Sequence, residues 1–228
     1  MVGNITPCIG EQDNQCLVTP PMKEEIREAL FSLNVDSALG PDGFPKKIYT
    51  SYWGILQDDI TRAIKDFFHH SYLRFGMNSN FIALLPKKGN DLDIKDFRPV
   101  AHGNTIPKLI SKILTNRMGR MVDGMITENQ FGFVPGRNIQ NCLFSASESV
   151  NLMRKKSNDG SFTLKVDISK AFDTLKLSFL LDVLKRYGFF DVFIKLISTI
   201  LYSTRMSIII NGTPRGFFPY TRGMRQGD

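Results

Sequence analysis

The sequence predicts a mixed α+β fold on three observations. The chain has 228 residues, of which 42% are hydrophobic, so it is long enough for one sizeable domain or two small ones and too apolar to be wholly disordered. Segments with apolar residues at helical spacing are interleaved with short extended runs. The dipeptide Asn211-Gly212 lies between two such runs and predicts a two-residue β-hairpin turn.

The first part of the chain predicts a lead-in and two helices. Residues 1–18 are polar and irregular, which is typical of a linker. A helix is expected after the cap residue Thr19, since the two prolines that follow fit a first turn and Ile26 and Leu30 have helical spacing. It ends before SALGPDGF, a dense turn signal. An approximate apolar face predicts the second helix over residues 46–73.

The rest of the chain alternates extended and helical segments. Strands are expected at 80–85, within DIKDFRPVA and in SFTLKVDI, and a hairpin in RMSIIINGTPRGFF. Helices are expected at 105–122, 138–156 and 190–203 and in LSFLLDVLKRYG, where a glycine follows the last turn. This succession supports the mixed fold class.

Composition narrows the kinds of partner and compartment. Lys and Arg outnumber Asp and Glu by 29 to 22, a net charge of +7. A basic surplus favours nucleic acid, because bound phosphates release counterions, but it equally fits a solvated surface without a partner. Three scattered cysteines favour a reducing setting, and the sequence has neither a signal peptide nor a membrane span. We therefore expect an intracellular protein of the nucleus or cytoplasm that is not secreted.

One carboxylate occupies an unusual position. In SFTLKVDI the apolar side chains share one face and Asp167 lies on the other, just before Phe172 and a helix. A carboxylate at such a corner suits Mg²⁺, which prefers oxygen ligands. Two magnesium ions that bridge a phosphoryl transfer need more than one carboxylate, however, and Asp173 fits a helix cap better. A simple surface position for Asp167 stays open from the residues alone.

Eight motifs, in order over about residues 20–228, resemble the reverse transcriptase of non-LTR (LINE-type) retrotransposons, most like those of plants. The motifs are SALGPDGFP (37–45), FIALLPKK (81–88), DFRPVA (96–101), KLISKILTNRM (108–118), ENQFGFVPGRNIQN (128–141), KVDISKAFD (165–173), INGTPRGFF (210–218) and RGMRQGD (222–228). Transcriptases of group II introns and bacterial maturases share the fold, but SALGPDGFP and the wording of the following motifs favour the LINE type.

The resemblance implies a right-hand polymerase fold with fingers, palm and thumb. Residues 1–19 would be a variable linker, residues 20–160 the N-terminal extension and fingers, and residues 161–228 an incomplete palm, with the thumb absent. Asp167 would be the first catalytic, metal-binding aspartate of the palm, and the backbone carbonyl of Ile168 would be a secondary ligand of the metal that binds the nucleotide. Phe172 would be the aromatic gate that rejects a 2′-hydroxyl, although core packing is an equal alternative for its ring.

The resemblance also assigns nucleotide and template contacts. Lys87 and Arg98 would hold the triphosphate, with Lys88 as an alternative to Lys87. Gln226 would lie near the incoming base pair. The template contacts would be Gly136, Arg137 and Arg225, each of which also fits a turn glycine or a surface arginine.

The implied activity is RNA-directed DNA synthesis with two Mg²⁺ ions, an RNA template, a DNA primer and deoxynucleoside triphosphates. In this family the partner acids are an adjacent Asp-Asp pair after an aromatic residue, and no such pair follows RGMRQGD in this sequence. The expectation is that the 228-residue chain alone does not polymerise. The alternative function is a basic RNA- or DNA-binding remnant without catalysis. The sequence leaves the oligomeric state open.

Overall fold

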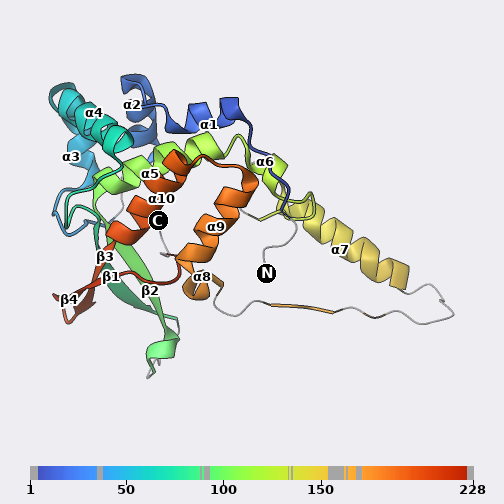
Figure 1. Ribbon diagram of the computed structural model, residues 1–228. Helices are drawn as coiled ribbons and strands as arrows, with labels where there is room; N and C mark the ends of the chain where they lie inside the picture. Colours follow the sequence, from blue (N-terminus) through green and yellow to red (C-terminus); the bar gives the residue numbers. More distant parts are fainter. Residues whose placement is uncertain are drawn as a thin grey trace.

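The computed structural model combines a layer of helices with a small sheet (Figure 1) and describes residues 5–34, 38–87, 89, 93–132, 134, 136–153, 162, 164–167 and 171–224. The helices are α1 (Glu11–Val18), α2 (Lys23–Ser32), α3 (Lys46–Ser51), α4 (Trp53–His70), α5 (Thr105–Met118), α6 (Val122–Met125), α7 (Ile139–Met153), α8 (Ala171–Thr174), α9 (Leu177–Tyr187) and α10 (Asp191–Ser203), with a 3-10 turn at Ile94–Asp96. The strands are β1 (Ser79–Pro86), β2 (Phe97–Gly103), β3 (Arg205–Ile210) and β4 (Thr213–Pro219). The predicted mixed class is confirmed.

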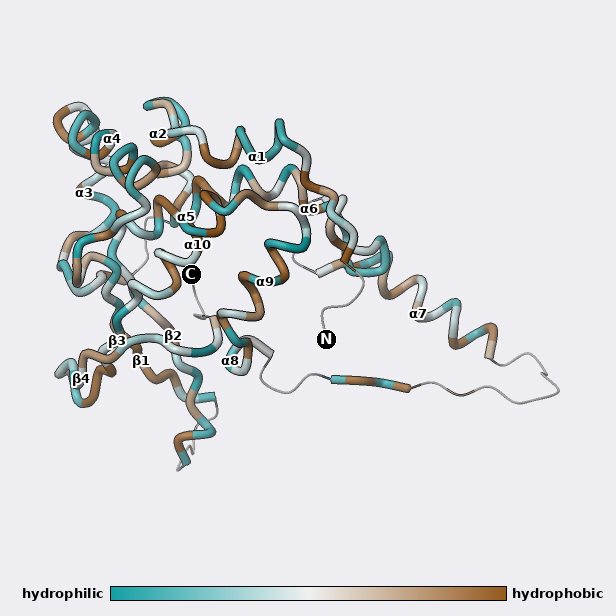
Figure 2. Tube along the Cα trace, in the orientation of Figure 1, coloured by the Kyte–Doolittle hydropathy of each residue, from teal (hydrophilic) through white to brown (hydrophobic). Residues whose placement is uncertain are grey.

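The hydrophobic core lies between helices. The fully buried apolar side chains of α1, α2, α4, α5 and α10 pack into one cluster, which includes Leu17, Ile26, Leu30, Ile64, Phe67, Leu109, Ile113, Phe193 and Leu196. Figure 2 shows hydrophobic residues along α9 and α10 and hydrophilic residues on the upper turns of α1. Burial of each such side chain contributes about 1.5–3 kcal/mol, so this cluster is the main source of stability.

The sheet has the order β2-β1-β3-β4. Strand β1 pairs antiparallel with β2 and parallel with β3, and β3 pairs antiparallel with β4. Asn211 and Gly212 join β3 to β4 with φ of 50° and 76°, the positive values that a two-residue hairpin turn of this kind requires. The predicted hairpin is confirmed, and the sheet fixes which side chains of three separate motifs share a face.

Several helix boundaries differ from the prediction. The first long helix begins at Lys23, so Pro20 and Pro21 precede its first turn. The helix expected over 46–73 is divided into α3 and α4 at Tyr52, whose backbone leaves the helical region. DIKDFRPVA forms the 3-10 turn before it becomes β2.

The lead-in at residues 1–18 was expected to be irregular, which is wrong for Glu11–Val18. This segment forms α1, with Leu17 and Asn14 buried. The Asn14 amide nitrogen donates to the carbonyls of Gly10 and Gly188, at 3.1 and 2.9 Å, and its oxygen accepts from the backbone N–H of Phe190 at 2.7 Å. The polar composition of this segment gave no sign of a helix, because the polar residue Asn14 makes its long-range hydrogen bonds. Whether residues 1–19 are a domain boundary stays a prediction.

The strand expected in SFTLKVDI is not confirmed. Residues 162 and 164–167 have no strand hydrogen bonds, and Phe162, Leu164 and Val166 are all at least 75% exposed. A strand with one apolar face forms only where a neighbour pairs with its backbone and covers that face, and β1–β4 of the described chain do neither for this segment. The predicted helix over 138–156 forms as α7. This helix projects from the rest of the molecule (Figure 1), and none of its residues is buried. Among the described helices, none has the length and apolar character needed to cross a bilayer.

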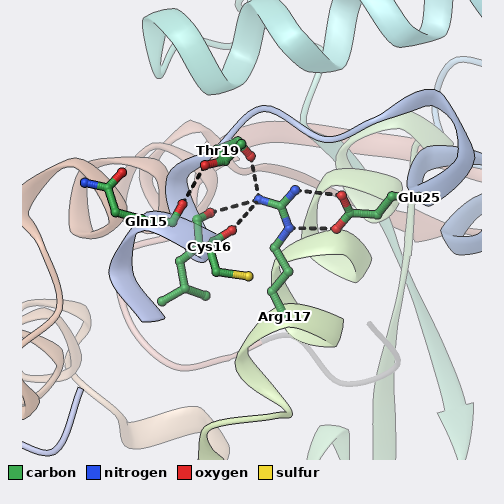
Figure 3. Close-up of polar contacts among 6 residues, drawn as sticks. Gln15, Cys16, Thr19, Glu25 and Arg117 are labelled. Carbon is green, nitrogen blue, oxygen red and sulfur yellow. Dashed lines mark hydrogen bonds and ion pairs between the residues drawn. The ribbon is translucent and has the colours of Figure 1, made fainter. Parts of the chain in front are cut away.

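Arg117 joins three helices through its buried side chain (Figure 3). At the end of α5, its guanidinium forms a two-pronged ion pair with Glu25 of α2, with both N···O distances 2.7 Å. Nη1 also donates to the carbonyl oxygens of Cys16, Leu17 and Thr19, where α1 ends. These carbonyls carry the negative end of the helix dipole, so a cation there is favourable. The same guanidinium lies 5.3 Å above the ring centre of Phe68 of α4.

Gly40 is required by a close approach between the SALGPDGF turn and α5. A Cβ atom on Gly40 would lie 2.5 Å from the Asn104 Oδ1 and 2.6 Å from the Asn104 backbone nitrogen. The same Asn104 side chain accepts from the Asp42 N–H at 3.1 Å and donates to the Met77 carbonyl at 2.8 Å. The turn, the start of α5 and the entry to β1 are thus held by one amide.

Substitution Arg117→Ala is expected to lower the free energy of unfolding by about 3 kcal/mol, because it leaves Glu25 and three helix-end carbonyls without their cation. Urea unfolding followed by circular dichroism measures this loss. Arg62→Ala is the matched control, since Arg62 pairs with Asp59 on the exposed side of α4 and should cost less than about 0.5 kcal/mol. Equal losses for the two variants would contradict the assignment.

Substitution Gly40→Ala is expected to cost about 2 kcal/mol, because the added methyl group overlaps the Asn104 backbone. The control is Gly54→Ala, where the new methyl group meets no atom within 4 Å and a gain of about 0.5 kcal/mol follows from helix propensity. Unfolding midpoints of both variants, compared with the parent chain, check the pair. A Gly40→Ala chain as stable as the parent would show that the approach is looser than described.

Candidate active site

The antiparallel pairing of β1 and β2 brings together the two cations predicted to bind the triphosphate. Leu85 is directly opposite Arg98, and the N–H of Lys87 donates to the Asp96 carbonyl at 2.8 Å, which extends the ladder past the end of β1. Side chains alternate along a strand and opposed residues share a face, so Lys87 and Arg98 lie on the same face of the sheet. Lys87 and Arg98 are eleven residues apart in the sequence, and the turn between β1 and β2 brings them close together.

The two cations differ in their surroundings. The Lys87 ammonium donates to the Lys95 carbonyl at 2.6 Å, whereas the Arg98 guanidinium is exposed. Two exposed cations on one face can neutralise adjacent phosphate oxygens, with the planar fork of arginine adding two-pronged contacts. Lys88, the predicted alternative to Lys87, lies outside the described residues. On the same strand as Arg98, burial and the nearby Lys108 cation lower the pKa of His102.

Asp167 is not brought to these cations. It is exposed in an extended stretch, 164–167, which Figure 1 draws between α7 and α8, apart from the β1–β2 turn. Among the described residues, no three or more His, Cys, Asp or Glu side chains gather closely enough to hold a metal ion. The described residues therefore do not fit a two-magnesium site. Residues 164–167 form no strand hydrogen bonds, so no pairing holds Asp167 beside the sheet.

The RGMRQGD motif meets the chain just beyond the KVDISKAFD motif. The N–H of Gly223, in RGMRQGD, donates to the Leu175 carbonyl at 2.7 Å, just after α8. Gly223 has a φ of 88°, a value that side chains other than hydrogen rarely permit. Phe172 lies within α8, next to this contact, although its side chain is not described. Ile168, Arg225 and Gln226 lie outside the described residues, so their roles stay predictions.

The motif contact borders a hollow of about 190 Å³ against the sheet. Ile82, Ala101 and Met206 form its floor, on the face opposite to Arg98, and Asp173, Tyr220 and Arg222 line its side. An acid and an arginine beside a conformationally special glycine were not predicted as site residues. The sequence could have indicated both residues, because Asp173 directly follows Phe172 and Arg222 directly precedes Gly223.

A larger cavity of about 760 Å³ contains none of the predicted site residues. It lies among α2, α5, α9 and α10 and is lined mainly by apolar side chains, together with Lys46, Lys108 and Lys112. Burial lowers the pKa of Lys46, whose ammonium lies 3.5 Å from the Phe31 carbonyl. The cavity belongs to the helical layer.

Arg137 forms contacts that its predicted template role does not require. Its guanidinium pairs with Asp123 at 3.1 Å and donates to the carbonyls of Ile126, Thr127 and Gln130. The preceding Gly136 has a φ of 80°, as expected for a turn glycine. In this structure the side chain holds the loop after α6 together. Contact with a template phosphate stays a prediction for both residues.

Substitution Arg137→Gln is expected to raise hydrogen exchange of the Ile126 and Gln130 amides by about tenfold, because loss of one charged hydrogen-bond set of ~1.5 kcal/mol opens the loop. Arg98→Gln is the matched control and should leave these amides unchanged, since Arg98 is exposed on the sheet. Exchange followed by mass spectrometry or NMR checks both. Unchanged protection in Arg137→Gln would contradict the loop contacts.

Comparison with known proteins supports the motif resemblance. The sequence profile of the family described as "Reverse transcriptase (RNA-dependent DNA polymerase)" matches residues 85–228, more than half of the chain. The chain is 28% identical over 221 residues to the "Transposon TX1 uncharacterized 149 kDa protein" of Xenopus laevis, an alignment that covers 97% of the chain and 17% of that protein.

Two R2 proteins of insects are also similar. The chain is 23% identical over 209 residues to the "Retrovirus-related Pol polyprotein from type-1 retrotransposable element R2" of Nasonia vitripennis, covering 92% of the chain and 20% of that protein. It is 25% identical over 210 residues to the corresponding type-2 R2DM polyprotein of Drosophila melanogaster, covering 90% and 19%. The chain thus spans a fifth or less of the length of these relatives. On the profile match over residues 85–228, the chain belongs to the reverse transcriptase (RNA-dependent DNA polymerase) family.

Proposed function

We propose that the chain forms the fingers and part of the palm of a right-hand polymerase that copies RNA into DNA for a non-LTR retrotransposon. The observation that carries this proposal is the β1–β2 register, which places Lys87 and Arg98 on one face. The relatives named for transposon TX1 and element R2 agree with the retrotransposon part. A plant host, the finer expectation from the motif wording, stays a prediction.

The proposed reaction joins a deoxynucleotide to a DNA primer on an RNA template. The primer 3′-hydroxyl oxygen forms a bond to the α-phosphorus and its proton passes to solvent. The bond from that phosphorus to the β-phosphate oxygen breaks, and pyrophosphate leaves with its electron pair. In this chain Lys87 and Arg98 would bind the triphosphate and neutralise charge that develops on the leaving phosphates. Phe172 would limit the space beside the sugar.

Magnesium dependence is part of the proposal for the longer polymerase only. Among the described residues, Asp167 belongs to no group of three or more potential metal ligands, so no step is assigned to a metal on them. The further carboxylates would have to come from residues beyond those described here.

A second candidate function is RNA or DNA binding without catalysis. It is favoured by the net charge of +7 and by the four strands, which carry Arg98, Arg205 and Arg215 and no acidic residue. Both candidates use the same basic surface, so binding alone does not separate them. Primer extension does.

In a polypeptide extended to the full polymerase length, Asp167→Ala is expected to lower primer extension at least a hundredfold, because the attacking and leaving oxygens lose a metal-binding carboxylate. Affinity for the template–primer should change less than twofold. Extension of a labelled primer and anisotropy of the same duplex measure the two quantities. Asp182→Ala, on the exposed side of α9, is the control acid and should leave both unchanged.

Survival of extension in the Asp167→Ala polymerase would contradict the catalytic assignment of Asp167. The 228-residue chain tested by itself should bind template but incorporate no deoxynucleotide, since it offers one of the proposed acids. Incorporation by this chain would refute that part of the proposal and would also exclude the binding-only alternative.

A further inference from the structure

Aromatic and arginine side chains from three parts of the chain meet at the β3–β4 side of the sheet. The Phe75 ring, in the turn before β1, packs edge-on against Phe217 of β4, with ring centres 5.7 Å apart. The Arg205 guanidinium, at the start of β3, lies 5.6 Å above the Phe75 ring centre. Phe75 and Phe217 are 78% and 48% exposed, and the exposed Arg74 and Arg215 flank them in sequence. We refer to Phe75, Phe217 and Arg205 as the aromatic–arginine edge.

The backbone holds this edge in place. The Arg205 N–H donates to the Asn78 carbonyl at 3.0 Å, and its Nη1 donates to the carbonyls of Tyr202 and Thr204 at 3.3 and 3.1 Å. Asn78 in turn is buried and donates to the Ile200 carbonyl at the end of α10. The guanidinium and the ring it covers therefore have fixed positions before any ligand binds, which lowers the entropy that binding would cost.

The surroundings of the edge are positive. The sequence contains no Asp or Glu from residue 71 to residue 90 or from 192 to 227, and these two segments supply β1, β3 and β4. A second aromatic–arginine pair is different. Arg27 lies 5.2 Å above the Phe31 ring, but it is on α2 among Glu24, Glu25 and Glu28. Among the described residues, the edge thus combines exposed rings with arginines in segments that carry no acidic residue, and this combination fits a polyanion that carries flat bases.

The edge is continuous with the proposed nucleotide site. Arg205 is opposite Ser79 and Arg98 is opposite Leu85, so both arginines lie on one face of β1, six residues apart. At 3.3 Å per residue this separation is about 20 Å. A nucleic-acid strand that leaves the Lys87 and Arg98 region along this face would reach Phe75 and Phe217.

Pairing of β4 with a strand of another protein fits the edge less well. Pro214 and Pro219 lack N–H groups, and the register of β3 with β4 shifts between Met206 and Ile208. Gly216 at this bulge has a φ of 72°, and the Ser207 hydroxyl donates a hydrogen bond to the Gly216 carbonyl at 2.7 Å. Prolines and bulges on an outer strand oppose strand addition. The side chains, rather than the backbone, are therefore the available binding groups.

We propose that the aromatic–arginine edge binds single-stranded RNA, with bases stacked on Phe75 and Phe217 and phosphates held by Arg205 and Arg74. The choice of RNA rests on the proposed function, in which RNA is the strand that is copied. The edge is distinct from the nucleotide site and would hold the template outside it. Stacking on exposed rings tolerates every base, so this contact adds affinity without sequence preference.

The test measures binding of the full chain to a fluorescein-labelled 12-nucleotide oligoadenylate RNA by anisotropy at several salt concentrations. Phe75→Ala and Phe217→Ala should each weaken binding by about tenfold without changing the salt dependence, because stacking involves no counterions. Arg205→Gln should reduce the slope of log affinity against log salt by about 0.7, the value for one phosphate contact on a single strand. Phe75→Leu, which keeps an apolar side chain without a ring, should weaken binding like Phe75→Ala.

Arg27→Gln is the matched control, since it removes an arginine from an aromatic ring in acidic surroundings, and it should bind RNA like the parent chain. Unchanged affinity in both phenylalanine variants, or an equal loss in Arg27→Gln, would overturn the proposal. Tighter binding of the DNA oligonucleotide of the same sequence would overturn the assignment to RNA. The assay needs no catalysis, so its failure is distinguishable from failure of primer extension in the Asp167 experiment.

Discussion

The buried cation of Arg117 is the constraint on which the helical layer depends. A guanidinium removed from water is unfavourable unless its donors are satisfied, and here Glu25 and three carbonyls at the end of α1 satisfy them. Because those partners come from α1 and α2 while the cation comes from α5, one side chain fixes the relative positions of three helices. The apolar cluster around Leu109 and Ile113 then packs against a framework that is already defined.

The sheet depends on that layer through side-chain amides. Asn78 joins the entry of β1 to the end of α10, and Asn104 joins the SALGPDGF turn to the start of α5. These contacts set where β1 begins, and its pairing with β2 and β3 then places Arg98 and Arg205 on a common face. Functional geometry in this chain therefore follows from register, and register follows from how the strands are anchored to the helices.

Local signals in the sequence were sufficient for much of this architecture. The Asn211-Gly212 hairpin follows from turn chemistry, and α5 and α10 follow from apolar spacing, because both depend on neighbouring residues alone. The reverse transcriptase family, inferred from eight motifs in order, is confirmed by the profile match over residues 85–228. Adjacency of Lys87 and Arg98 also follows from a short connection between two strands.

Features that depend on distant partners could not be predicted in the same way. Alternation in SFTLKVDI indicates a strand, but a strand also needs a paired neighbour, and Asp167 has a fixed place only if that neighbour exists. The contacts of Arg137 with Asp123 and three backbone carbonyls could not be predicted from the motif, because the motif gives only the neighbouring residues of Arg137 in the sequence. Helix α1 was missed because Asn14, rather than an apolar residue, makes its longest-range contacts.

The sheet face that carries Arg98 of β2 and Arg205 of β3 is, in this proposal, the nucleic-acid face of the protein. The most direct measurement is photocrosslinking of a 4-thiouridine-substituted RNA template, annealed to a DNA primer, followed by mass-spectrometric mapping of the crosslinked peptides. The account predicts crosslinks within residues 71–87, 97–103 and 205–219. Crosslinks confined to the outer surfaces of α2 and α4, with none on the strands, would contradict it.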